Sequence, residues 1–485
     1  MQQWVHIIGI CGITTSGVAV MFKNMGWKVT GSDKGFFPPV SDYLKKYQIE
    51  ITPGFKLERL HQDKRHPDLV VIQGTKSDKN EEYQEALRLN LNIMPYAQVL
   101  KEYVVCENSV VIVGSFGKTT ITSILVNIFK TANIDISYMY GGLDPDYSAN
   151  VVAKTDKTSF SIIEGDEYLT SFNDRSSKFF HYKPKYLLIN GIEYDHVDLF
   201  STFTDYLNNF KKLIAQVPED GFIIANIDDQ NVQKALIGAR CKVIGFSCKQ
   251  NLQLKPDWYL LRESKPLPTI IKNIKTSTDE LVIIPFERKI IGNYNDINML
   301  AAAVMAHSLG IKPTAIQKGL NTYSGIQRRL QIKASYLNWL IIDDFGSTPA
   351  KAEAAIKTIK SEYPQHKLIA VFEPNSGNRD YKALTLFKNT FALSDLVIIP
   401  KFTLIPKSAS KKYSENELWE YINDNGNKAE YLPVDTDVIT ALKLALNQNK
   451  KSIILFLGSH SFRGMINKIV SILEDGKTQK STTIK

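Results

Sequence analysis

The stretch "VVIVGSFGKTT", residues 110–120, decides how the whole chain is interpreted. An apolar run typical of a buried strand, Ser109–Val113, leads into Gly114, and Gly117–Thr120 then opens a segment with the pattern of a helix. The common form of a phosphate-binding loop has a glycine six residues before its lysine, where this chain has Ile112. The stretch is therefore either a chance match or a nucleotide site of a different design.

The residues of this loop suit phosphate chemistry. Gly114 and Gly117 would let backbone amides turn toward phosphate oxygens that a side chain would otherwise keep at a distance. Lys118 can reach the β- and γ-phosphates of a nucleotide, and the hydroxyl of Thr119 or Thr120 can bind Mg²⁺. The alternative is a strand–glycine–helix junction that holds no ligand.

Acidic residues follow a second apolar run, "FSIIEGDEY" at 160–168, which predicts a buried strand. Its end carries three carboxylates, those of Glu164, Asp166 and Glu167. A further predicted strand, in "YLLINGIEYDHVD" at 186–198, is followed by Asp195 and His196. Carboxylate, hydroxyl and phosphate oxygens are the ligands that Mg²⁺ prefers, so these strand ends favour a metal–phosphate site beside the loop.

The N-terminal segment, "WVHIIGICGITTSGVAVMFKNMGWKVTGSD" at 4–33, has the pattern of a strand–helix–strand unit. Strands are expected at Val5–Ile8 and Trp27–Thr30, joined by a glycine-rich turn and a helix. The spacing Gly9-x-x-Gly12 differs from the G-x-G-x-x-G of dinucleotide-binding proteins, so binding of NAD is not expected. Either backbone amides at the helix start face a phosphate or pyrophosphate, or the glycines only permit close packing.

Length and alternation together predict the domain organisation. At 485 residues the chain is too long for one hydrophobic core, and strands alternate with helices throughout. We expect an α/β protein of three domains. The predicted domains are 1–105, 106–324 and 325–485. The family resemblance given below implies that they are a Rossmann-like substrate-binding domain, a central ATP-binding domain of the P-loop type and a Rossmann-like C-terminal domain.

The composition, 44% hydrophobic and 22% charged, is typical of a soluble globular protein, and no apolar run is long enough to span a bilayer. The chain enters a predicted strand almost at once, so a cytoplasmic location without membrane insertion is expected. A net charge of +9 suits either a nucleic acid or an anionic small molecule. Because the lysines are dispersed and no nucleic-acid-binding motif is present, we expect no nucleic-acid partner.

These motifs, taken in order, resemble the Mur ligases, the ATP-dependent amide-forming family of peptidoglycan synthesis. The short loop of that family, G-[TS]-x-G-K-[TS]-[TS], matches Gly114–Thr120. "GNYNDINMLAAA" at 292–303 is similar to the stretch that contacts adenine in the family. "GIQRRL" at 325–330 and "IIDDFGSTP" at 341–349 resemble the start of its last domain.

The resemblance implies ATP and Mg²⁺ as cofactors and gives roles to individual residues. The implied catalytic residues are Lys118, Glu164 and His196. The implied ATP-binding residues are Gly114, Ser115, Gly117, Lys118, Thr119, Thr120, Tyr294, Asn295, Arg329 and Asp344, with the last two acting after domain closure. The implied metal ligands are Thr119, Glu164 and His196, with Lys211 as a candidate carbamate. The implied contacts to the uridine diphosphate are Gly9, Gly12, Ser32 and Asp33.

The implied reaction activates the carboxylate of UDP-N-acetylmuramate as an acyl phosphate, which an incoming amine then attacks, releasing ADP and phosphate. The segment 162–200 is similar to the branch that attaches the tripeptide L-Ala-γ-D-Glu-meso-diaminopimelate, and we expect that acceptor. The alternatives are L-alanine as acceptor, or a non-catalytic nucleotide-binding regulator. Three departures from the family pattern stand out: Phe116 in the loop, Ser347-Thr348 in place of two histidines, and "EPNSGNRD" at 373–380.

Overall fold

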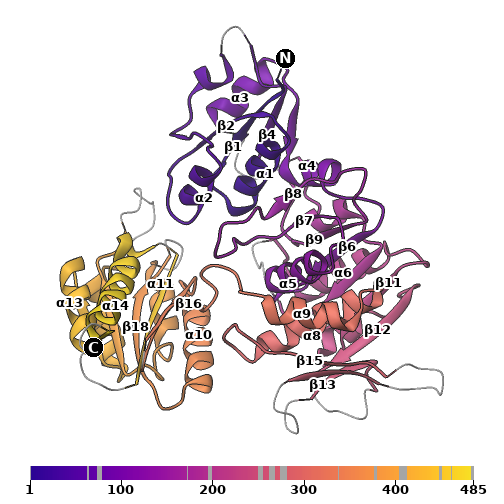
Figure 1. The fold of residues 1–485 in the computed structure, drawn as a ribbon. Coiled ribbons are helices and arrows are strands. Elements are labelled where there is room, and N and C mark those ends of the chain that lie inside the picture. The colour runs from indigo at the N-terminus through magenta and orange to yellow at the C-terminus, as the bar shows by residue number, and fades with distance from the viewer. Residues whose placement is uncertain are drawn as a thin grey trace. The chain divides into compact units, whose positions relative to one another are not determined.

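The structure is a computed structural model, and within its described residues the backbone forms three β-sheets flanked by helices (Figure 1). In the same part of the chain, no helix combines the length and the apolar composition that crossing a membrane requires. The expected α/β class with largely parallel sheets is confirmed. The described residues are 2–62, 65–73, 79–171, 173–194, 199–248, 255–261, 268–273, 281–336, 338–375, 379–403, 412–446, 451–459 and 461–481.

The N-terminal sheet is parallel, with the strand order β3-β2-β1-β4-β5. Every residue of its central strand is buried, and the chain leaves this strand through a glycine turn into α1. The strands are β1 (Trp4–Ile8), β2 (Lys28–Asp33), β3 (Thr52–Pro53), β4 (Leu69–Ile72) and β5 (Ile93–Pro95). The helices are α1 (Ile13–Asn24), α2 (Val40–Lys46), η1 (Leu57–Leu60), α3 (Glu81–Arg88) and α4 (Tyr96–Tyr103).

The central sheet has the order β15-β14-β13-β12-β11-β10-β6-β9-β7-β8 and is parallel from β13 to β7. Antiparallel pairings add β14 and β15 at one edge and β8 at the other. The sequence patterns did not predict the edge β13–β15. The strands are β6 (Ser109–Val113), β7 (Ile136–Met139), β8 (Val151–Val152), β9 (Phe160–Glu164), β10 (Tyr186–Ile189), β11 (Phe222–Asn226), β12 (Lys242–Ser247), β13 (Trp258–Leu261), β14 (Thr269–Lys272) and β15 (Ile283–Pro285).

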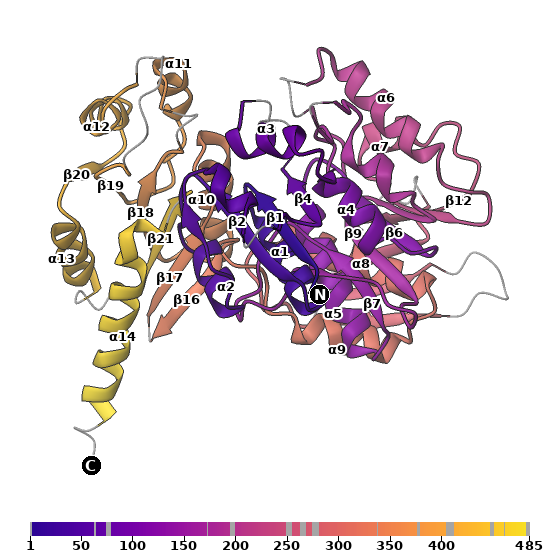
Figure 2. The same ribbon diagram turned by 90° about the horizontal axis from the view of Figure 1, so that it is seen from above.

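Helices cover both faces of the central sheet. Buried residues of α6 belong to the same hydrophobic core as Val111 and Val113 of β6, while α5, α8 and α9 contact one another on the other face (Figure 2). Because β6 and β10 are buried on both sides, they consist almost entirely of apolar residues. The helical segments are α5 (Lys118–Thr131), η2 (Lys178–Tyr182), α6 (Phe203–Ile214), α7 (Gln230–Ala235), α8 (Tyr294–Ser308) and α9 (Pro313–Thr322).

The C-terminal sheet has the order β16-β17-β21-β18-β19-β20, with β16 antiparallel to its neighbour and the other pairings parallel. The strands are β16 (Gln331–Tyr336), β17 (Trp339–Asp344), β18 (Lys367–Glu373), β19 (Leu396–Pro400), β20 (Ala429–Leu432) and β21 (Ser452–Gly458). The helical segments are α10 (Pro349–Glu362), α11 (Tyr381–Leu384), η4 (Thr385–Phe387), α12 (Glu415–Asp424), α13 (Asp435–Leu446), η5 (Phe462–Gly464) and α14 (Met465–Ser481).

The described residues group into two compact units. Residues 1–289 and 294–326, which contain the N-terminal and central sheets, form the first unit. Residues 290–293 and 327–485, which contain the C-terminal sheet, form the second.

Within the first unit, α1 packs closely against β8 and so joins the N-terminal sheet to the central one. A Cβ atom on Gly17 of α1 would lie 2.4 Å from the Asn150 side-chain oxygen and 2.5 Å from a Val151 methyl group. The Tyr43 hydroxyl donates a hydrogen bond to the same Asn150 oxygen at 2.9 Å and so holds it in place. Gly17 is therefore required for this close approach.

We predict that Gly17→Ala destabilises the protein. Alanine gains about 1 kcal/mol in helix propensity, but overpacking a well-filled contact costs about 1–3 kcal/mol, and neither contacted group can move freely. The midpoint of the first thermal unfolding transition, measured by calorimetry, should fall. Lys23→Ala, at an exposed position of the same helix, is the control and should change it little. A Gly17→Ala protein as stable as wild type would contradict this packing.

Candidate functional site

The loop between β6 and α5 adopts a backbone that two glycines make possible. Gly114 has φ +133° and Gly117 has φ +79°. A Cβ atom on Gly114 would lie 2.8 Å from the Gly191 carbonyl oxygen, and one on Gly117 would lie 2.6 Å from the Asn298 side-chain oxygen. Both the dihedral angles and the lack of space exclude other residues here. The loop thus has the glycine-dependent backbone that is typical of phosphate-binding loops.

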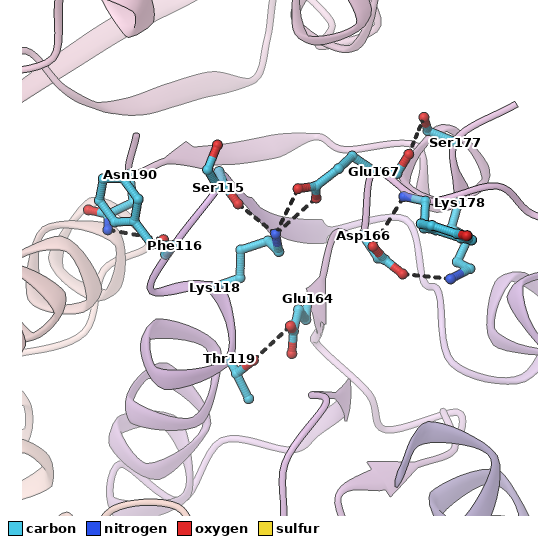
Figure 3. Close-up of polar contacts among 12 residues, drawn as sticks. Ser115, Phe116, Lys118, Thr119, Glu164, Asp166, Glu167, Ser177, Lys178 and Asn190 are labelled. Atoms are coloured by element: carbon cyan, nitrogen blue, oxygen red, sulfur yellow. Dashed lines mark hydrogen bonds and ion pairs between the residues drawn. The ribbon is translucent and has the colours of Figure 1, made fainter. Parts of the chain in front are cut away.

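Lys118 is the first residue of α5, and its ammonium group lies at the mouth of this loop. It donates hydrogen bonds to the Gly114 carbonyl oxygen at 2.6 Å and to both Glu167 oxygens at 2.9 and 3.1 Å (Figure 3). Burial favours the neutral amine, but the adjacent Glu167 carboxylate outweighs this and raises the pKa of Lys118 above its usual range. The amine is therefore charged and aimed at the loop.

Thr119 and Glu164 form a second polar pair beside the loop. The Thr119 hydroxyl donates to one Glu164 carboxylate oxygen at 2.7 Å, and the Gly141 amide donates to the other at 2.6 Å. Burial raises the pKa of the Glu164 carboxyl, although both hydrogen bonds oppose that shift. Hydroxyl and carboxylate oxygens at this spacing fit a hard divalent cation such as Mg²⁺. Thr120, the other hydroxyl considered from the sequence, is the next residue of α5.

The three carboxylates at the end of β9 point to different partners (Figure 3). Glu164 binds Thr119, Glu167 binds Lys118, and Asp166 accepts a hydrogen bond from the Lys178 ammonium at 2.6 Å. Among the described residues, no three His, Cys, Asp or Glu side chains converge on a point where they could hold a metal. Because the three carboxylates are close in sequence, the sequence predicts that they contribute to one site. In the structure each pairs with a different residue, which depends on tertiary contacts.

Glu167 has a role that the sequence analysis did not assign. Its side chain is completely buried, and besides Lys118 it accepts a hydrogen bond from the Tyr206 hydroxyl at 3.2 Å. That hydroxyl also lies 3.0 Å from the Ser115 hydroxyl in the loop. Glu167 therefore connects the loop to α6. Its position next to the other acidic residues was visible in the sequence, but its partner was not.

The segment after β10 lies against the same loop. The Ser115 amide donates to the Gly191 carbonyl oxygen at 2.9 Å, and the Ser115 hydroxyl donates to the Glu193 carbonyl oxygen at 2.7 Å. Asp195 and His196, which follow this segment, lie outside the described residues. Their expected contribution to metal binding stays a prediction.

The Phe116 ring packs against Gly191, in the segment that follows β10. A Cβ atom on Gly191 would lie 2.4 Å from the tip of the Phe116 ring, so the ring rests on the backbone of this glycine. The Phe116 carbonyl oxygen accepts a hydrogen bond from the Asn190 amide at 3.3 Å. Phe116 is 46% exposed, so it packs against Gly191 from the protein surface.

The start of α8 lies next to the loop through Asn298. The Asn298 amide donates to the Asn295 side-chain oxygen at 2.9 Å, while the Asn298 oxygen faces Gly117. Asn295 is buried, and Tyr294 is 46% exposed. The structure therefore places the two residues expected to contact adenine at a helix start that adjoins the loop.

Arg329 and Asp344 belong to the second unit and lie near each other there. Arg329 is exposed, while the neighbouring Arg328 is buried and forms an ion pair with Asp343 at 3.3 Å. Asp344, at the end of β17, accepts a hydrogen bond from the Leu330 amide at 2.8 Å. Burial raises the pKa of the Asp344 carboxyl to about 6. Arg329 is the arginine of this pair whose side chain is accessible to a ligand.

Two of the four expected uridine diphosphate contacts, Gly9 and Asp33, line a cavity of about 740 Å³. The other two do not line it. Gly12 is the N-cap of α1, and Ser32 is buried with its hydroxyl donating to the Glu82 carboxylate. The cavity was not predicted by the sequence, because its wall combines residues from distant parts of the chain.

Lys211 lies in α6 and lines a separate, more open cavity of about 560 Å³ with Asp205 and Lys212. The carbamylation of Lys211 stays a prediction.

Three models of one family match consecutive parts of the chain. The Mur ligase family, catalytic domain, matches residues 4–105, and the Mur ligase middle domain matches 112–306. The Mur ligase, glutamate ligase domain, matches residues 328–460.

Two kinds of relative match most of the chain. A UDP-N-acetylmuramate–L-alanine ligase of Clostridium acetobutylicum is 28% identical over 95% of this chain and 95% of its own length. The ligase of the same name from Clostridium tetani is 30% identical over 81% of this chain and 82% of its own. A UDP-N-acetylmuramate–L-alanyl-γ-D-glutamyl-meso-2,6-diaminoheptandioate ligase of Haemophilus influenzae is 28% identical over 77% and 80%.

Solved structures share the fold over nearly the whole chain. A UDP-N-acetylmuramate–alanine ligase of Thermotoga maritima superposes with a TM-score of 0.74 at 20% identity, covering 98% of this chain and 100% of that one. A murein peptide ligase of Psychrobacter arcticus gives 0.70 at 23% identity, covering 97% and 98%.

We predict that Lys118→Ala weakens ATP binding by about 10- to 100-fold, because it removes charge-assisted hydrogen bonds worth ~1.5–3 kcal/mol. Binding of ATP with magnesium, measured by calorimetry, checks this. The double variant Lys118→Ala/Glu167→Gln avoids leaving Glu167 buried and unpaired, and it should show the same loss. Lys101→Ala, at an exposed position of α4, is the control. ATP affinity equal to wild type in a folded variant would exclude the loop as the nucleotide site.

We predict that Asp344 makes the protein less stable as the pH rises from about 4 to about 7. Its folded-state pKa of about 6 lies above its ordinary value of 3.8, so the folded protein keeps the proton longer than the unfolded chain. The stabilisation is complete below the ordinary pKa and is lost as the pH rises through the raised one. Urea unfolding should therefore show wild type losing stability relative to Asp344→Asn across this range.

In this comparison Asp424→Asn, at an exposed site, controls for the loss of one charge. A stability difference between wild type and Asp344→Asn that stays constant with pH would show that the Asp344 carboxyl has no raised pKa.

Proposed function

Because the chain belongs to the Mur ligase family, we propose that it joins UDP-N-acetylmuramate to the tripeptide L-Ala-γ-D-Glu-meso-diaminopimelate. As a member of that family it is an ATP-dependent ligase of peptidoglycan synthesis. The donor, the acceptor and the roles of individual residues are the proposed part.

One observation carries the ATP side of the proposal. Lys118 and Thr119 open a helix whose preceding loop needs glycine at Gly114 and Gly117, and both side chains face carboxylates from the end of β9. Such a strand–loop–helix junction binds phosphates through backbone amides, a lysine and a metal-binding hydroxyl. A non-catalytic nucleotide-binding regulator would use the same loop, so turnover, rather than ATP binding, distinguishes it from a ligase.

The relatives and the cavity support UDP-N-acetylmuramate as the donor. The names of both kinds of relative begin with that compound. The cavity of about 740 Å³ is large enough for a nucleotide sugar to enter, and its wall includes Gly9 from the N-terminal glycine turn. A net charge of +9 also suits a donor with a pyrophosphate and a carboxylate.

In the proposed reaction, a muramate carboxylate oxygen attacks the γ-phosphorus of ATP, and ADP leaves. The amine of the acceptor then attacks the carbonyl carbon of the acyl phosphate, loses a proton, and expels inorganic phosphate. Lys118 and the loop amides hold the transferred phosphoryl group and neutralise its charge. To do so, the Lys118 ammonium must exchange part of its contact with Glu167 for phosphate oxygens.

Thr119 and Glu164 are the described residues that would hold Mg²⁺, since their oxygens are hard donors that already meet at 2.7 Å. When bound, the ion supplies positive charge to the phosphate oxygens. Glu164 keeps its second oxygen on the Gly141 amide, which fixes the orientation of the carboxylate.

The acceptor is the part on which the two kinds of relative differ. The similarity of segment 162–200 to the tripeptide ligases supports the tripeptide. L-alanine is the second candidate, because an L-alanine ligase matches 95% of the chain. In the C-terminal unit, Thr348 caps α10 by accepting from the Lys351 amide, and the Ser347 carbonyl accepts from the Asn375 amide. Both residues therefore take part in local hydrogen bonds at the place where the family pattern has two histidines.

We predict ATP-dependent phosphate release with UDP-N-acetylmuramate and the tripeptide, and much slower release with L-alanine, L-serine or glycine. Phosphate release and product mass should be measured for each acceptor at equal concentration. Turnover with L-alanine alone would contradict the tripeptide as acceptor and support L-alanine instead. If the protein binds ATP but shows no turnover with any acceptor, the result would instead support a non-catalytic nucleotide-binding regulator.

A further inference from the structure

A lysine from the central domain lies in the wall of the cavity of about 740 Å³. Most of this wall comes from the N-terminal domain, and the central domain adds Tyr168, Leu169 and Lys178. Three lysines line the cavity, Lys34, Lys79 and Lys178, together with two acidic residues, Asp33 and Glu81. The Lys34 side chain is exposed, whereas the Lys178 side chain is only 9% exposed.

Burial of Lys178 is unusual, because a desolvated ammonium group needs polar partners. Among the residues that the structure describes, Asp166 is the hydrogen-bond acceptor that this ammonium reaches, at 2.6 Å. The rings of Tyr96 and Tyr168 lie 5.1 and 5.3 Å from the nitrogen, which is within the range of a cation–π contact. Asp166 and these rings keep the ammonium at the cavity wall.

The acidic residues of the wall do not cancel this positive charge. The Asp33 carboxylate accepts hydrogen bonds from the Cys11 amide at 2.9 Å and from the Lys34 amide at 2.7 Å, so the backbone already neutralises part of its charge. Glu81 is in the first turn of α3, where the helix dipole offsets a negative charge.

Asp166, the partner of Lys178, also accepts a hydrogen bond from the Tyr168 amide at 3.1 Å, so part of its negative charge is neutralised as well. With Lys34, Lys79 and Lys178 in its wall, the cavity is suited to an anion, and Lys178 is the buried lysine among the three.

We propose that Lys178 binds an oxyanion of the donor substrate, either the pyrophosphate or the muramate carboxylate, and is a specificity residue for that substrate. This inference rests on the proposed function, since it takes UDP-N-acetylmuramate as the occupant of the cavity. Lys178 is part of η2, in the central domain, so the domain that holds ATP also contacts the donor.

The chain segment that holds Lys178 also contacts the phosphate loop. Asp166, which holds Lys178, lies between Glu164 and Glu167, which contact Thr119 and Lys118 of the loop. A single short segment at the end of β9 therefore contacts both the lysine of the cavity wall and the polar groups of the phosphate loop.

The test is calorimetric binding of three ligands to wild type and to Lys178→Met: UDP-N-acetylmuramate, UDP-N-acetylglucosamine and UDP. We expect UDP-N-acetylmuramate to bind at least about 10-fold more weakly to the variant, because a charge-assisted hydrogen bond is lost. An equal loss for all three ligands would identify the pyrophosphate as the bound oxyanion. A loss confined to UDP-N-acetylmuramate would identify the muramate carboxylate, which the other two lack.

Two further proteins make the result decisive. Lys185→Met is the matched control, because Lys185 also pairs with an aspartate, Asp220 at 3.1 Å, but does not line the cavity. The double variant Asp166→Asn/Lys178→Met removes the unpaired carboxylate if the single variant fails to fold. ATP affinity and thermal unfolding, measured on each variant, establish that the loop and the fold persist.

Affinities for all three ligands within twofold of wild type, in a folded Lys178→Met or double variant, would overturn the role of Lys178 alone. Wild type that binds ATP but not UDP-N-acetylmuramate would instead overturn the proposed donor, and the inference with it. The two failures are therefore distinguishable.

Discussion

The ion pair between Lys118 and the buried Glu167 is the contact on which the proposed nucleotide site depends. A lysine that is removed from water without a counter-ion loses its charge or destabilises the fold, so the carboxylate keeps the ammonium charged and in place. The pair can form because Gly114 and Gly117 let the chain turn from β6 into α5 within hydrogen-bonding distance of β9. Glu167 therefore holds the Lys118 ammonium beside the loop when no ligand is bound. Phosphate oxygens of a bound nucleotide would compete with Glu167 for the same ammonium.

The end of β9 distributes three negative charges among three partners. Glu164 accepts a hydrogen bond from the Thr119 hydroxyl, Glu167 from the Lys118 ammonium, and Asp166 from the Lys178 ammonium. If these carboxylates faced one another, their mutual repulsion would raise their pKa values and weaken the site. Pairing each carboxylate with a different hydrogen-bond donor avoids this, and under the proposed function it would support two substrate sites at one strand end.

The sequence predicted what depends on local patterns. The strand Ser109–Val113 has the bounds of β6, because a continuous apolar run before a glycine loop leaves little choice of structure. The partner of Glu167 and the contact of Lys178 with Asp166 were not predictable, since these residues meet only after strands and helices pack. The Phe116 ring illustrates the same limit, because Gly191, on which it rests, lies in another strand–loop segment. Ser32 likewise turned inward to Glu82, which its position in a glycine-rich strand end did not indicate.

The central claim is that the loop at Lys118 transfers the γ-phosphoryl group of ATP to a carboxylate of the donor. The direct measurement uses UDP-N-acetylmuramate labelled with ¹⁸O in its carboxylate, with mass spectrometry of the phosphate released during ligation. Attack by that carboxylate leaves one of its oxygens on phosphorus when the amine expels phosphate, so labelled phosphate is predicted. Unlabelled phosphate, released together with the ligated product, would contradict the account.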